Sequence, residues 1–75
     1  MDWPEAERLV AALDPAGRDV LLRALTTTQE QRAELIGRLY QLSPVPEIAE
    51  LLILLEEREW ARQAMIELLR KSATD

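Results

Sequence analysis

Few side chains in this sequence belong to types that perform chemistry. The 75-residue chain has no histidine and no cysteine, so neither a Ser-His-Asp nor a Cys-His arrangement can form, and a structural zinc site is not expected. Its two serines are Ser43, which precedes a proline, and Ser72, which lies near the end of the chain. Neither position is the setting of an activated nucleophile. We therefore expect no enzyme activity and assign no catalytic residue.

A carboxylate cluster offers the other chemical possibility. Glu56, Glu57 and Glu59 could in principle hold a cation, but they lack the Glu-x-x-His pattern of di-iron bundles and the Asp/Gly spacing of a calcium loop. A charge run of this kind is usually a solvated helix face. The two glycines, Gly17 and Gly37, do not form a phosphate-binding loop. We expect neither a metal nor a cofactor.

The composition predicts an all-α fold. Leucine occurs 14 times and alanine 10 times, and no turn signal of a β-hairpin is present. We expect residues 1–75 to form one domain, a small bundle of three short helices plus one long C-terminal helix, completed by dimerisation. Without disulfides or zinc, a chain of this length needs tight helix packing or self-association to be stable.

Start signals set the bounds of the three short helices. Asp2, followed by a proline and a glutamate, predicts a helix over about 3–13. Asp14-Pro15 predicts the next over 15–25. The boxes Thr27-x-x-Glu30 and Thr28-x-x-Gln31 predict the third over 28–42. In that helix Gly37 either allows a close helix approach or is simply tolerated.

Two prolines precede the fourth and longest helix, which we expect over 46–71, with a frayed tail at 72–75. Such a helix would be about 39 Å long, more than the other three can cover. Residues 48–55 are apolar nearly all round the helix, and a second apolar stripe follows the carboxylate cluster. The predicted protein interface is Leu51, Leu52, Leu55, Arg58, Trp60, Met65 and Leu69.

Three arrangements of this long helix are open. In the first, two copies pair their helices antiparallel or crossed, and Arg58 sits at the seam. In the second, the helix breaks near Glu57 and its halves fold back as a hairpin within one chain. In the third, the helix forms a groove for a different protein. We expect a protein–protein interaction module that acts as a regulator, adaptor or assembly subunit, with a second copy and another protein as partners.

A DNA-binding function is the alternative. Residues 13–25, with their leucines and arginines, resemble the opening helix of winged-helix and sigma-type regulators, and 27–39 would be the following helix. The resemblance covers about a third of the chain and implies a dimeric regulator of helix-turn-helix type. Its nucleic-acid contacts would be Gln29, Arg32 and Arg38. Glu30 and Glu34 depart from the basic face that a recognition helix needs.

Charge and hydropathy bear on the location. The net charge is −5, which disfavours phosphate backbones and anionic membrane surfaces. The longest apolar run, Leu51 to Leu55, is far shorter than the about 20 residues that span a bilayer. The first residues lack the features of a secretory signal. These observations predict a cytoplasmic protein without a membrane partner.

Overall fold

The computed structural model describes residues 1–74, and the side chains of residues 1–72. This part of the chain contains five helices and no strand, which confirms the all-α prediction. The helices are α1 (Trp3–Ala12), α2 (Pro15–Thr26), α3 (Gln29–Leu42), α4 (Glu47–Glu57) and α5 (Glu59–Thr74). The bounds of the first three lie within one residue of those predicted.

The predicted residues begin these helices, although not every predicted hydrogen bond forms. Asp2 caps α1, because its carboxylate accepts a hydrogen bond from the Glu5 amide at 3.0 Å. Thr28 is the residue before α3, but its side chain makes no capping bond. Instead, the Thr27 hydroxyl donates to Oε1 of Gln31 at 2.8 Å. The turn is where the capping boxes predict it, with a different side-chain bond.

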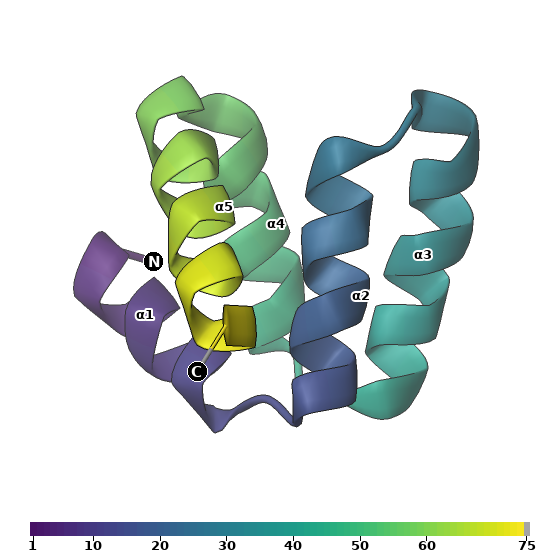
Figure 1. Ribbon diagram of the computed structural model, residues 1–75, viewed down its shortest axis with the longest axis horizontal. Helices are drawn as coiled ribbons and strands as arrows, with labels where there is room; N and C mark the ends of the chain where they lie inside the picture. Colours follow the sequence, from purple (N-terminus) through teal and green to yellow (C-terminus); the bar gives the residue numbers. More distant parts are fainter. Residues whose placement is uncertain (75) are drawn as a thin grey trace.

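The helices form two antiparallel hairpins and one outlying helix (Figure 1). α2 and α3 run side by side in opposite directions, and so do α4 and α5. The hairpins join through contacts between α2 and α5. α1 lies on the far side of α5 from α2 and α3.

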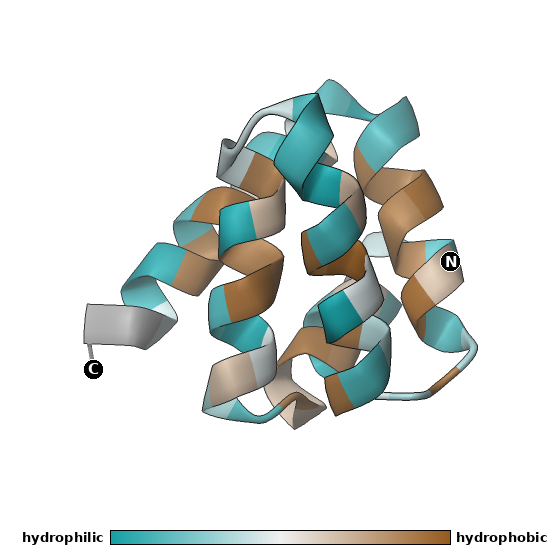
Figure 2. Ribbon diagram, turned by 90° about the vertical axis from the view of Figure 1, so that its right-hand side faces the viewer, coloured by the Kyte–Doolittle hydropathy of each residue, from teal (hydrophilic) through white to brown (hydrophobic). Residues whose placement is uncertain are grey.

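One apolar core lies where the hairpins and α1 meet. α4 contributes four of its members and α3 only one, because α3 is the outermost helix of its hairpin. Each helix alternates polar and apolar segments along its length (Figure 2), as expected when one stripe faces a core. The most deeply buried large side chains are Leu21, Leu39, Ile48, Leu51, Leu55 and Met65.

The prediction of one continuous helix over 46–71 is wrong, because a single residue, Arg58, interrupts the helix. Arg58 is extended (φ −121°, ψ 105°) and separates α4 from α5, which fold back on each other. Of the three arrangements left open, the hairpin within one chain is therefore the one seen. The sequence around Arg58 contains no helix breaker, so the break follows from packing: folding back places Ala61 and Met65 against the core.

Two smaller expectations also differ from the structure. A Cβ at Gly37 would meet nothing within 4 Å, so this glycine marks no close helix approach. The expected fray at 72–75 is wrong for residues 72–74, since α5 continues to Thr74. The Arg18 guanidinium donates to the Ser72 hydroxyl at 3.1 Å, which holds the end of α5 against α2. Asp75 lies outside the described residues.

Candidate protein-binding surface

The predicted interface residues separate into two groups. Arg58 and Trp60 are exposed, whereas the other five are buried inside the chain's own core, at 7% exposure or less. In this conformation the buried side chains cannot reach a partner. The buried five are Leu51, Leu52, Leu55, Met65 and Leu69.

Trp60 is the largest apolar side chain on the surface. It is 56% exposed, and its ring centroid lies 5.6 Å from that of Trp3, with the two planes tilted by 59°. The tilted contact is a favourable aromatic geometry, so Trp3 holds one edge of the Trp60 ring in place. Since Trp3 is itself half-buried against the core, the pair forms a fixed aromatic feature.

The local fold explains why Trp60 faces outward. Ala61, Met65 and Leu69 form the stripe of α5 that enters the core. Trp60 precedes Ala61 by one residue, about 100° round the helix, and so falls beside this stripe. Arg62 fixes the first turn of α5, because its guanidinium donates to the Leu25 carbonyl oxygen at 2.8 Å.

Three carboxylates precede Trp60 in the chain. Glu56, Glu57 and Glu59 are exposed and directly precede Trp60. Only Glu56 has an ion-pair partner on another helix: Arg32 of α3, at 2.9 Å. We call these five residues, Trp3, Glu56, Glu57, Glu59 and Trp60, the tryptophan surface. It combines a large exposed ring with three carboxylates, of which Glu56 pairs with Arg32 and Glu59 lies 3.8 Å from Arg62.

Three other large apolar side chains of the described residues are exposed. Ile53 is 53% exposed on the outer side of α4, and Leu42 and Val45 lie at the end of α3 and in the following linker. Figure 1 places the end of α3 at the opposite end of the bundle from the α4–α5 turn. Exposed apolar residues smaller than tryptophan are common on protein surfaces.

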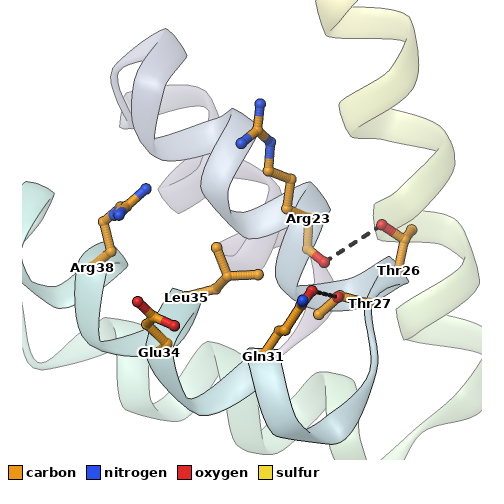
Figure 3. Close-up of a pocket in the computed structure, with 7 residues that line it drawn as sticks. All are labelled: Arg23, Thr26, Thr27, Gln31, Glu34, Leu35 and Arg38. Atoms are coloured by element: carbon orange, nitrogen blue, oxygen red, sulfur yellow. Dashed lines mark hydrogen bonds between the residues drawn. The ribbon is translucent and has the colours of Figure 1, made fainter.

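An open hollow of about 430 Å³ lies between α2 and α3 (Figure 3). Its lining includes the guanidinium groups of Arg23 and Arg38 and the carboxylate of Glu34. Arg23 also pairs with Asp19 at 3.2 Å. Because both signs of charge are present and the hollow is open to solvent, it does not concentrate charge for an ionic ligand.

The residues proposed for nucleic-acid contact do not share one face. Arg38 follows Gln29 by nine residues, about two and a half helical turns, so the two side chains project from opposite sides of α3. Arg32 is engaged by Glu56. α2 and α3 are also antiparallel neighbours, whereas the helices of a DNA-binding helix-turn-helix meet at a wide angle. No observation here favours DNA binding.

Within residues 1–74, no three acidic side chains gather as they would around a metal ion. In the same range, no helix is long and apolar enough to cross a membrane. The cytoplasmic location stays a prediction.

Comparison with known proteins identifies no relative. No family model, no curated protein and no solved structure matches this chain.

Proposed function

We propose that this chain is a non-catalytic protein–protein interaction module whose partner binds the tryptophan surface. The observation that carries the proposal is Trp60, a tryptophan that is 56% exposed and held by a second tryptophan. Tryptophan is among the residues most enriched at energetic hot spots of protein interfaces. A large ring left on the surface of so small a domain is best explained by a partner that covers it.

The chemistry of the surface defines the kind of partner. Three exposed carboxylates precede Trp60 in the chain, and the whole protein carries a net charge of −5. A complementary surface presents apolar side chains flanked by lysine or arginine, whose cations can also lie over an indole face. The proposed partner is therefore a basic, partly apolar protein segment.

Comparison of two truncations tests this proposal. Wild-type protein, Trp60→Ala and Leu42→Ala are immobilised, and proteins retained from an extract of the source cells are quantified by mass spectrometry. Leu42→Ala is the matched control, because it removes an exposed apolar side chain at the other end of the bundle. Circular dichroism checks that both variants stay folded.

The expected result is a basic protein whose retention falls at least about tenfold with Trp60→Ala and is unchanged with Leu42→Ala, as for a hot-spot truncation. Raising the salt concentration should weaken the same retention. Equal retention by all three proteins would show that Trp60 is not the binding residue. Loss with Leu42→Ala alone would assign the function to the other end of the bundle.

The second part of the proposal is self-association through the C-terminal segment, α4 and α5. A chain of 75 residues without disulfides has little core to stabilise it alone. The tryptophan surface is a poor site for a second copy. In a symmetric pair the carboxylates of one copy would face the same carboxylates of the other and repel them. Self-association therefore needs a different contact.

A further inference from the structure

The link between α4 and α5 differs from the other three links of the chain. It consists of the single residue Arg58, and its neighbours Glu56, Glu57 and Glu59 all favour helix. The other links contain a residue that favours a helix start or a proline: Asp14 before Pro15, Thr27-Thr28, and Ser43 to Pro46. The chain thus reverses direction at a point where its local sequence favours continuing the helix.

The break leaves several local groups in unfavourable positions. The Arg58 amide donates to Leu54 O at 3.0 Å, and Arg62 is the next residue whose amide bonds four residues back, to Arg58 O at 3.1 Å. The amides of residues 59–61 are therefore first-turn donors without an acceptor inside the helix. Arg58 has no side-chain oxygen to cap them. Glu56 and Glu57 stand at the C-terminus of α4, where the helix dipole disfavours anions.

Packing of α5 against the rest of the chain opposes these costs. Ala61, Met65 and Leu69 are buried, and α5 contacts both α2 and α4. Arg62 and Ser72 add hydrogen bonds to α2. None of these contacts requires that α5 belong to the same chain, because an α5 from a second copy presents the same side chains.

We propose that two copies of this chain exchange α5. Arg58 becomes helical, α4 and α5 join into one helix from Glu47 to Thr74, and each α5 packs on the α2 and α4 of the other copy. The exchange keeps every core contact and removes the unfavourable groups at the break. Domain swapping through a short hinge is a low-cost route to a dimer.

The dimensions make a second copy necessary once the hinge straightens. A helix over 47–74 is about 42 Å long, whereas the largest extent of the single chain is 28 Å. Leu51, Leu55 and Met65 then contact residues of the other copy. These predicted interface residues would thus be buried between two copies, whereas in the single chain they are buried within it. This inference rests on the self-association part of the proposed function, and its hinge residue lies between Glu57 and Glu59 of the tryptophan surface.

Two substitutions of the hinge residue provide a matched test. Arg58→Ala and Arg58→Gly remove the same exposed charged side chain, but alanine favours a helix and glycine disfavours it. Each protein is refolded at high and at low concentration, and its mass is measured by light scattering after size exclusion. Because a dimer contains two hinges, Arg58→Ala should dimerise about 30-fold more tightly than Arg58→Gly.

A distance measurement identifies the exchange itself. The chain has no cysteine, so Glu47→Cys and Arg70→Cys give one labelled pair at exposed positions near the open end of the hairpin. Dimers are formed with an excess of unlabelled Arg58→Ala protein, so that only distances within one chain are seen. Exchange predicts about 35 Å along a straight helix. The closed hairpin predicts a clearly shorter distance, since packed helix axes lie about 8–10 Å apart.

Each outcome decides between the two ideas. A long distance with dimers favoured by Arg58→Ala supports the exchange. Dimers in which the labels at positions 47 and 70 are a short distance apart would support self-association but contradict the exchange of α5. Monomers of the wild type and both variants at every concentration overturn both, while partner binding at Trp60 stands or falls by its own test.

Discussion

The two hairpins of this molecule reverse the chain for different reasons. Between α2 and α3, the turn consists of Thr27 and Thr28, and the Thr27 hydroxyl donates a hydrogen bond to Gln31. Between α4 and α5, one arginine interrupts a run of helix-favouring residues. The first turn agrees with its local sequence, whereas the second opposes it.

This difference carries over to packing. α3 contributes one buried residue, Leu39, so its hairpin depends on local signals and on contact with α2. α4 and α5 together contribute half of the buried apolar residues of the described chain, and their turn exists because both helices reach the core. A turn that forms because of tertiary packing can be lost when the packing partner changes. A turn that its local sequence favours remains under the same change.

The largest expected effect comes from weakening the packing that imposes the α4–α5 turn. Met65 is fully buried, so Met65→Ala should lower the free energy of unfolding by about 3 kcal/mol. Leu35→Ala, at a half-buried position of α3, should cost only about 1 kcal/mol. Chemical denaturation followed by circular dichroism measures both. Equal losses would mean that the two hairpins depend on core packing to the same extent.

Removal of the hydrogen bond that anchors the first turn of α5 should have an intermediate effect. The Arg62 guanidinium donates to Leu25 O at 2.8 Å in a partly buried setting, so we expect Arg62→Ala to cost about 1–2 kcal/mol. Arg23→Ala is the control within α2, because it breaks only an exposed pair with Asp19 and should cost about 0.5 kcal/mol or less. Denaturation curves of the two variants would contradict this account if Arg23→Ala proved the more costly.

The contrast between the turns also explains what the sequence could predict. Asp2, Asp14-Pro15 and the threonines act within a few residues, so the bounds of α1, α2 and α3 were predictable to within one residue. A break near Glu57 was one of three arrangements that the sequence left open, but the sequence could not select it, since its cause is the burial of Ala61 and Met65 by helices distant in sequence. Trp60 belongs to the apolar stripe that the sequence predicts, but it lies on the surface because Ala61 and Met65 take the side of α5 that faces the core, and no sequence signal indicates that exposure.

The smallest expected effect concerns the ion pair that joins the two hairpins. Arg32 of α3 lies 2.9 Å from Glu56 of α4, and the carboxylate is more than half exposed. Glu56→Gln should therefore cost about 0.5 kcal/mol or less at low salt, and the cost should vanish at high salt. Glu57→Gln is the matched control, with the same charge change one residue away.

A double-mutant cycle with Arg32→Gln isolates the coupling between the two side chains. A coupling energy above about 1 kcal/mol that persists at high salt would contradict the expected weak ion pair. Such a pair would hold the two hairpins together specifically. The proposed exchange of α5 requires that the coupling energy between Arg32 and Glu56 be small. Glu56 is two residues before the hinge residue Arg58, so an ion pair that salt screens lets Arg58 enter a helix without first breaking a strong contact between α4 and α3.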